Sequence, residues 1–80
     1  MYFTYVASSL SGSYLYKGHC KDMEKRLKQH NSGQTKSIRP YIPLEIIYFE
    51  EFETLKESID REKFFKSAAG RQFLKKVLSE

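Results

Sequence analysis

The first 17 residues contain two short apolar runs that are separated by a polar turn. The segment YFTYVAS, residues 2–8, is rich in aromatic and β-branched residues, and SYLYK, residues 13–17, repeats this character after a turn of serine and glycine. Such a pattern predicts a β-hairpin. Because side chains alternate between the two faces of a strand, Tyr14 and Tyr16 are expected on the same face.

The spacing of the apolar residues then changes to that of a helix. Met23 and Leu27 lie four positions apart, and Asp22 is a favourable N-cap. The pattern predicts a helix that runs to about Asn31, with Gly33 in the usual position after its C-terminal end. The residues expected on its outer side are polar: Glu24, Lys25, Lys28 and Gln29.

A third strand is predicted after a polar, proline-containing loop. The loop covers residues 32–43, and the apolar run LEIIYFEEF, residues 44–52, follows it. Thr54 and Glu57 then match a capping box, so a helix is expected from Thr54 to about Ala69. Gly70 breaks this pattern.

The chain is expected to end in a short helix over residues 71–78 that closes over the core. The predicted order is therefore β-β-α-β-α-α, an α+β domain with a small, mainly antiparallel sheet. Its 80 residues, 40% hydrophobic and 15% aromatic, are typical of one globular domain over residues 1–80. A core of this size leaves little room for unpaired charges.

Positive charge is concentrated in the first half of the chain. Residues 1–40 contain seven basic and two acidic residues, whereas residues 41–80 contain seven basic and eight acidic residues, within a net charge of +4. The asymmetry indicates either a solvated basic face or a nucleic acid partner. For a nucleic acid partner, the candidate contacts are Lys17, Lys21, Lys25, Lys28, Lys36 and Arg39.

Cysteine content and hydropathy bear on the compartment. The single cysteine, Cys20, excludes an internal disulfide framework, and the N-terminal residues lack the features of a secretory signal. No apolar segment approaches the roughly 20 residues that a membrane span requires. We therefore expect a cytoplasmic protein that does not contact a membrane and is a monomer or a weak dimer.

Two charged residues are expected on buried sides of helices. Arg26 and His30 lie beside Met23 and Leu27 on the inner side of the first helix. Arg26 either extends to the edge, pairs with a carboxylate of the core, or faces a site. On the second helix, Glu62 lies in the predicted buried stripe of Leu55, Ser58, Ile59, Phe65 and Ala69. Glu62 either pairs with Arg26 or binds a divalent cation.

Tyrosines and histidines add to the candidate chemistry. Tyr5, Tyr14 and Tyr16 are either packing residues of the hairpin or, beside an arginine and a glutamate, hydroxyls that move a proton. His19, Cys20 and His30 are a weaker alternative as zinc ligands, because there is no second cysteine and two of them are adjacent.

The ordered set of these residues resembles the GIY-YIG nucleases, in particular the small stand-alone members of YhbQ type. Phe3-Thr4-Tyr5 stands at the position of the first triplet, Tyr16-Lys17-Gly18 at the second, and Arg26 follows Gly18 at the family's spacing of eight. His30 to Gly33 match His-Asn-Ser-Gly, and Arg61 to Lys63 match Arg-Glu-Lys. The departures are Phe3-Thr4 and Lys17 within the triplets, and the absence of a secure polar counterpart near Ser67.

The resemblance implies a three-stranded antiparallel sheet flanked by helices and a catalytic groove. Tyr5, Tyr16, Arg26, His30 and Glu62 are then the catalytic residues, and they are expected to converge on one concave surface. Glu62 is expected to hold one Mg²⁺ or Mn²⁺ ion at the scissile phosphate while a tyrosine activates water. Since the reference pKa of tyrosine is about 10, Lys17, Arg26 and the ion are expected to lower it.

The resemblance therefore implies a divalent-metal-dependent endonuclease that acts on DNA and selects branched or damaged structures in repair or recombination. The alternative is a module of the same fold that binds DNA or RNA without cutting it. An inward glutamate favours the enzyme, because binding alone does not require one.

Overall fold

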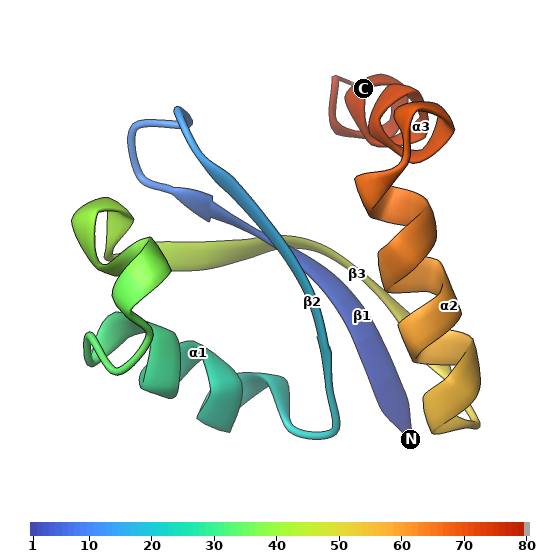
Figure 1. Cartoon of the computed structure of the whole chain (residues 1–80), viewed down its shortest axis with the longest axis horizontal. Helices are drawn as coiled ribbons and strands as arrows, with labels where there is room; N and C mark the ends of the chain where they lie inside the picture. Colours follow the sequence, from blue (N-terminus) through green and yellow to red (C-terminus); the bar gives the residue numbers. More distant parts are fainter. Residues whose placement is uncertain (80) are drawn as a thin grey trace.

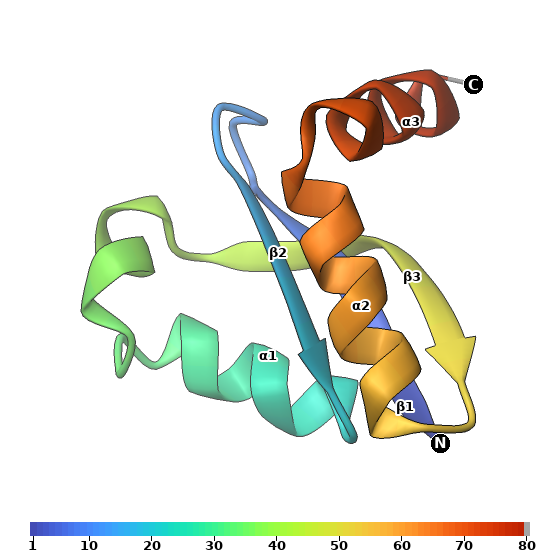
Figure 2. The same cartoon turned by 45° about the vertical axis from the view of Figure 1, so that its right-hand side comes forward.

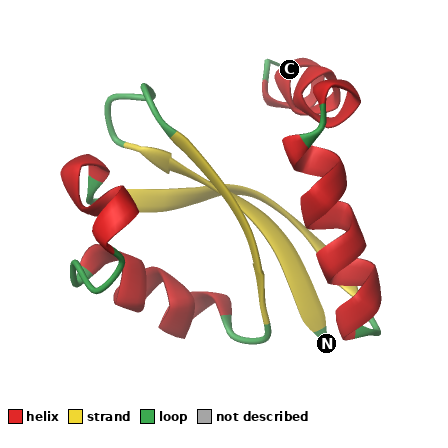
Figure 3. Cartoon of the chain, viewed as in Figure 1, coloured by secondary structure: helices red, strands yellow, loops and turns green. Residues whose placement is uncertain are grey.

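The computed structural model describes residues 1–79, and it has seven elements of secondary structure (Figures 1 and 3). Their bounds are β1 Tyr2–Ser9, β2 Leu15–Cys20, α1 Met23–Asn31, the 3₁₀ helix η1 Lys36–Tyr41, β3 Leu44–Phe52, α2 Leu55–Lys66 and α3 Ala68–Leu78. The α+β class and the order of strands and α-helices confirm the prediction from the sequence.

The three strands form one antiparallel sheet in the order β2-β1-β3. β1 is therefore the central strand, and its residues 4–9 are all buried. Tyr5 pairs with Gly18 on one side and with Phe49 on the other. Both β2 and β3 are edge strands, so each leaves one row of backbone groups outside the sheet.

The helices cover the two faces of this sheet separately (Figure 2). On one face, Tyr5 and Ala7 of β1 pack with Ile38 of η1 and with Met23 and Leu27 of α1. The other face packs against α2 and α3 in a cluster centred on Val6, Phe65 and Leu74. The alternation of side chains along β1 assigns successive residues to opposite clusters.

Local sequence signals account for α1 and the start of α2. Asp22 accepts a hydrogen bond from the backbone N of Lys25 at 3.1 Å, and Gly33 has a φ of +82° after the helix end. Thr54 and Glu57 form the reciprocal hydrogen bonds of a capping box. These predicted helix ends are confirmed, because caps satisfy the backbone groups that a helix leaves unpaired.

The predicted loop over residues 32–43 is wrong in part, because η1 occupies its centre. Ile38 is fully buried there, and its packing against the sheet fixes a turn that the polar composition did not indicate. The side chain of Asn31 also binds both backbone groups of Leu44, at 3.1 and 2.7 Å, which joins the end of α1 to the start of β3.

The second strand begins two residues later than predicted and continues to Cys20. Ser9 binds Tyr14 through backbone and side chain, so Tyr14 belongs to the turn and not to the strand. Its ring stacks on Tyr41 of η1 with centroids 4.1 Å apart. Tyr14 and Tyr16 nevertheless pack against the same core cluster.

The predicted break between the last two helices is also displaced. Ser67 ends α2 and caps α3 by accepting a hydrogen bond from the backbone N of Gly70 at 3.1 Å. Gly70 lies inside α3, where a Cβ atom would come 1.7 Å from the backbone oxygen of Phe64. The glycine permits close contact between two helices and is not the break itself. Leu55 and Ala69 are exposed, contrary to the predicted stripe.

Arg61 has a structural role in joining α2 to β3. Its guanidinium binds Glu50 through two hydrogen bonds of 2.7 and 3.2 Å, and it lies over the rings of Phe64 and Phe73 at 4.6 and 4.8 Å. Glu50 also accepts a 2.6 Å hydrogen bond from Tyr48. Planar guanidinium groups suit such combined ion-pair and stacking contacts.

Candidate active site

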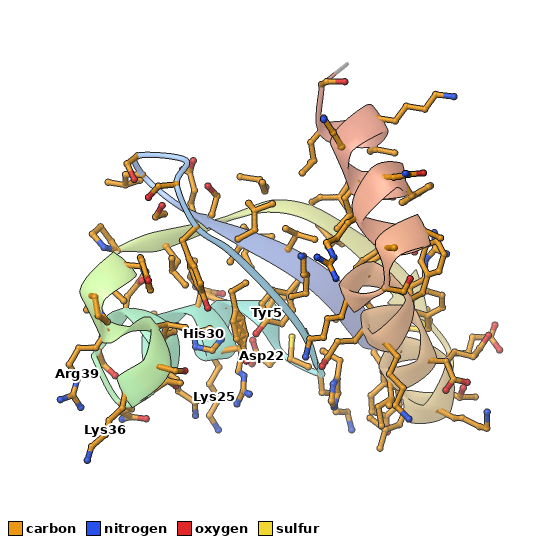
Figure 4. All side chains as sticks on the ribbon, turned by 45° about the horizontal axis from the view of Figure 1, so that its top comes forward. Tyr5, Asp22, Lys25, His30, Lys36 and Arg39 are labelled. Carbon is orange, nitrogen blue, oxygen red and sulfur yellow. The ribbon has the colours of Figure 1, made fainter. Side chains whose placement is uncertain are left out.

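Tyr5 and His30 form a buried pair at the interface of the sheet with α1 (Figure 4). The Tyr5 hydroxyl lies 2.8 Å from Nε2 of His30, and their exposed fractions are 0% and 1%. Gly18, opposite Tyr5 on β2, makes this position of the ring possible, since a Cβ atom there would lie 2.8 Å from the Tyr5 hydroxyl oxygen. The second triplet of the sequence therefore ends in glycine for a steric reason.

Tyr16 completes an aromatic group around this pair. Its ring centroid lies 6.1 Å from that of Tyr5, nearly parallel, and 4.7 Å from that of His30. Tyr16 is half-buried, whereas Tyr5 is fully enclosed. Tyr16 therefore lies between the buried hydrogen bond and the solvent.

The surroundings of His30 favour its neutral form. Burial lowers the pKa of His30, and the positive charge of Arg26 lowers this pKa further. Among the described residues, Nδ1 of His30 has no hydrogen-bond partner. A neutral imidazole can accept a proton through Nε2, so His30 is a suitable base for the Tyr5 hydroxyl.

The surroundings of Tyr5 oppose its ionisation in the absence of a ligand. Burial raises the pKa of Tyr5, and the neighbouring Tyr16 adds to the rise, while Arg26 acts in the opposite direction. The expectation that Lys17 lowers the pKa of this tyrosine is wrong. Lys17 lies on the other face of the sheet, where burial and the charges of Arg71 and Lys66 lower its own pKa.

Arg26 lies on the predicted side of α1, but its side chain is exposed to solvent. It lines an open groove of about 520 Å³ at the end of β2. The other residues of this groove are Tyr2, His19, Cys20, Lys21, Asp22, Lys25, Gln29 and Leu55. Interaction with Tyr5 raises the pKa of Arg26, so its charge is fixed. The groove therefore presents a permanent cation beside the Tyr5 and His30 pair.

Glu62 lies on the opposite side of the sheet from Tyr5 and Tyr16. Its Oε1 atom is 2.6 Å from Nδ1 of His19, and its Oε2 atom is 2.7 Å from Nζ of Lys66. Burial would raise the pKa of Glu62, but the hydrogen bonds from Lys66 and His19 hold it below its usual value. Glu62 is therefore ionised, and it does not pair with Arg26.

The expectation that five side chains converge on one concave surface is wrong, because Glu62 lies on the other face of the sheet and Arg26 alone of the five lines the groove. Tyr5, Tyr16, Arg26 and His30 gather on the α1 face, while α2 carries Glu62 on the other face. The two faces meet at β2 because β2 is an edge strand. His19, which binds Glu62, also lines the groove that contains Arg26.

The zinc alternative is wrong for its predicted ligands. His30 lies on the α1 face, whereas His19 turns toward α2. Within residues 1–79, no group of three His, Cys, Asp or Glu side chains gathers around one point.

Mg²⁺ fits the carboxylate of Glu62 better than Zn²⁺ fits its three predicted ligands. Mg²⁺ commonly takes one or two carboxylates and keeps several waters, and Glu62 offers one ionised, partly buried carboxylate. The ammonium group of Lys66 lies against that carboxylate, so an ion would have to displace Lys66 from Oε2.

The candidate nucleic acid contacts fall into two groups. Lys25, Lys36 and Arg39 extend outward on the side of α1 and η1, as Figure 4 shows. Lys21 lies in the loop before α1 and Lys28 lies on the exposed side of this helix. Lys17 belongs instead to a second basic group on the α3 side, with Lys66, Arg71 and Lys75.

Sequence reasoning considered His19 only as a zinc ligand and did not assign a role to Lys66 or Arg71. The signal for His19 was its position one residue after Gly18, since alternation along β2 turns it to the face opposite Tyr5. Lys66 follows Glu62 by four residues, which is the spacing of a helical ion pair. Arg71 gave no comparable signal, because the corner between α2 and α3 brings it near Lys17.

Known proteins are similar to this chain over nearly all of its length. The model of the GIY-YIG catalytic domain matches residues 1–76. A UPF0213 protein from Staphylococcus saprophyticus is 38% identical over 95% of this chain and 93% of its own length. UPF0213 proteins from Bacillus licheniformis and Clostridium perfringens are 41% and 37% identical, over 88% and 82% of this chain and 72% of their own lengths. No solved structure matches significantly.

The fold, the buried tyrosine and the groove arginine define a domain of nuclease type. The chain belongs to the GIY-YIG family. Over residues 1–79, none of the helices combines the length and the apolar character that a membrane span needs.

Proposed function

We propose that this protein hydrolyses phosphodiester bonds in nucleic acid, preferentially DNA, with the help of one divalent ion. The observation that carries the proposal is the Tyr5 and His30 hydrogen bond beside the fixed charge of Arg26. A domain that only binds phosphates has no need for a buried hydroxyl joined to a neutral imidazole, because exposed lysines suffice for binding.

In this proposal, Arg26 binds the scissile phosphate from the groove. A guanidinium group matches phosphate oxygens with two parallel hydrogen bonds, and it stabilises the charge that develops as the bond breaks. Its exposed position gives the phosphate direct access.

Tyr5 and His30 would move the proton of the attacking water. His30 accepts the hydroxyl proton of Tyr5 through Nε2, and the resulting phenolate oxygen takes a proton from water. The raised pKa of Tyr5 makes this transfer unfavourable in the free protein. A bound cation and the charge of Arg26 would favour it by stabilising the phenolate.

Glu62 would hold Mg²⁺ or Mn²⁺, with Lys66 turning away from Oε2 when the ion binds. The bound ion would supply positive charge to the phosphate and to the leaving oxygen. His19 binds Glu62 and lines the groove, and in this proposal it connects the two sides of β2.

The direct test is incubation of the purified protein with single-stranded, duplex, nicked and branched DNA and with RNA, in Mg²⁺, Mn²⁺ or EDTA. We expect cleavage of at least one DNA structure that EDTA abolishes, and a loss of at least 100-fold in Arg26→Ala, the scale of removing one group that stabilises transition-state charge. Tight binding of every substrate without cleavage in either metal would instead support a binding module for DNA or RNA.

The binding module remains the second candidate because of one observation. Both oxygens of Glu62 are already bound, by His19 and Lys66, so the carboxylate is satisfied without a metal ion.

A further inference from the structure

The contact between His19 and Glu62 is short and accessible. Nδ1 and Oε1 are 2.6 Å apart, and the side chains are 36% and 17% exposed. His19 is held by β2 and Glu62 by α2, two elements that pack directly on each other. The pair is therefore fixed in position by the fold, yet solvent reaches the imidazole.

We propose that His19 and Glu62 together form a nitrogen and oxygen site for a divalent transition metal ion, with His19 as a ligand through Nδ1. This inference rests on the metal-dependent function proposed above and assigns the ion a second protein ligand. It predicts a preference for Mn²⁺ or Co²⁺ over Mg²⁺.

The spacing of the two atoms suits a shared ion. Two ligand atoms at bonds of about 2.1 Å and at right angles are roughly 3 Å apart, so a small rotation of either side chain would admit the ion. A ligand Nδ1 must carry no proton, so the ring proton of His19 would be on Nε2 in the bound state. The Lys66 ammonium would leave Oε2 and return to solvent, where it remains charged.

The metal preference follows from the ligand type. Imidazole nitrogen binds first-row transition ions more strongly along the series from Mn²⁺ to Cu²⁺, whereas Mg²⁺ prefers oxygen ligands and water. A lone Glu62 would discriminate little between these ions. The nitrogen of His19 would therefore make the site bind Co²⁺ and Mn²⁺ more tightly than Mg²⁺.

Isothermal titration with CoCl₂, MnCl₂ and MgCl₂ in the absence of nucleic acid tests the proposal. His19→Gln can still donate a hydrogen bond to Glu62, but it lacks a ligand nitrogen. We expect this variant to lose at least about tenfold in Co²⁺ affinity, the scale of perturbed metal sites, and to change little toward Mg²⁺. Glu62→Gln should lose affinity for both Co²⁺ and Mg²⁺. Lys66→Gln should bind both ions more tightly, because the Lys66 ammonium no longer competes for Glu62.

Two controls separate this site from other donors. Cys20→Ser should leave Co²⁺ affinity unchanged, because the Cys20 thiol packs on the α1 face. The wild-type protein has two histidines, so NMR can follow each imidazole directly. Co²⁺ should shift the ring signals of His19 much more than those of buried His30, which lies across the sheet.

Equal Co²⁺ affinity in the wild type and His19→Gln, or unshifted His19 signals at saturating Co²⁺, would overturn the site. Cleavage of DNA by a protein with this result would leave the proposed function intact while the inference fails. His19-dependent Co²⁺ binding without cleavage would support the inference and contradict the function.

Discussion

Tyr5 and His30 contact each other although they are 25 residues apart and come from a strand and a helix. The spacing of four between Arg26 and His30 predicted that both lie on one side of α1, and the structure confirms this, because both interact with Tyr5. The sequence did not predict that His30 is fully buried while Arg26 is exposed, because this depends on how closely α1 packs on the sheet. The same packing raises the pKa of Tyr5.

Removing the Tyr5 hydroxyl tests its chemical role. Tyr5→Phe should abolish cleavage and lower the free energy of unfolding by about 1–2 kcal/mol, because His30 loses its partner. Tyr48→Phe is the matched control, since it removes a hydrogen bond of 2.6 Å to Glu50 on the other face. Rates of cleavage and urea denaturation check both variants. Equal cleavage by Tyr5→Phe and the wild type would exclude Tyr5 as a proton carrier.

The pH dependence of cleavage should report His30. The pKa of His30 lies below the ordinary value of 6.5. Its imidazole therefore becomes protonated only when the pH falls below 6.5. The rate should therefore be constant from pH 7 down to pH 6.5 and decline below it. A single-turnover profile on one substrate measures this. A midpoint above pH 7 would contradict a buried, neutral His30.

Element boundaries show where local signals suffice. Asp22, Thr54 and Glu57 predicted two helix starts correctly because a cap acts within a few residues. The 3₁₀ helix η1 and the corner at Ser67 escaped prediction, because both depend on contacts with distant parts of the chain. Glu62 is the clearest case: its helical stripe predicted burial, but only the fold decides which face of the sheet α2 covers.

The corner between α2 and α3 provides a stability test. Gly70→Ala would place a Cβ atom 1.7 Å from the backbone oxygen of Phe64, so the two helices must separate. We expect a loss of about 3 kcal/mol or more in the free energy of unfolding. Gly12→Ala, in open space with a φ of +77°, should cost only about 1–2 kcal/mol. Similar values for both in urea denaturation would contradict the proposed role of Gly70.

At the scale of the whole molecule, basic side chains form two groups on either side of β2. One group follows α1 and η1, and the other joins Lys17 to Arg71 and Lys75 of α3. Counting charge along the chain found the first group but missed the second, because its members are far apart in sequence. A nucleic acid strand that follows the edge of β2 would contact both groups.

Salt dependence of binding tests this surface. Lys28→Ala with Lys36→Ala should reduce the slope of log affinity against log salt by about two units, since each phosphate contact contributes about 0.9. Lys56→Ala with Lys63→Ala removes the same charge from exposed positions on α2 and should change the slope little. Fluorescence anisotropy with a labelled duplex measures both. Equal slopes in the two double variants would exclude the α1 and η1 side as the binding surface.

The central claim is that Glu62 serves a metal-dependent reaction on nucleic acid, and Glu62→Gln tests it most directly. The measurement is Mg²⁺-dependent cleavage of one DNA substrate by this variant, with its DNA affinity and melting temperature determined on the same sample. Because Gln at position 62 can keep hydrogen bonds to His19 and to the exposed Lys66, the replacement should cost at most about 1 kcal/mol in stability. We expect cleavage to disappear while affinity and melting temperature stay close to the wild type. Undiminished Mg²⁺-dependent cleavage by Glu62→Gln would contradict the account.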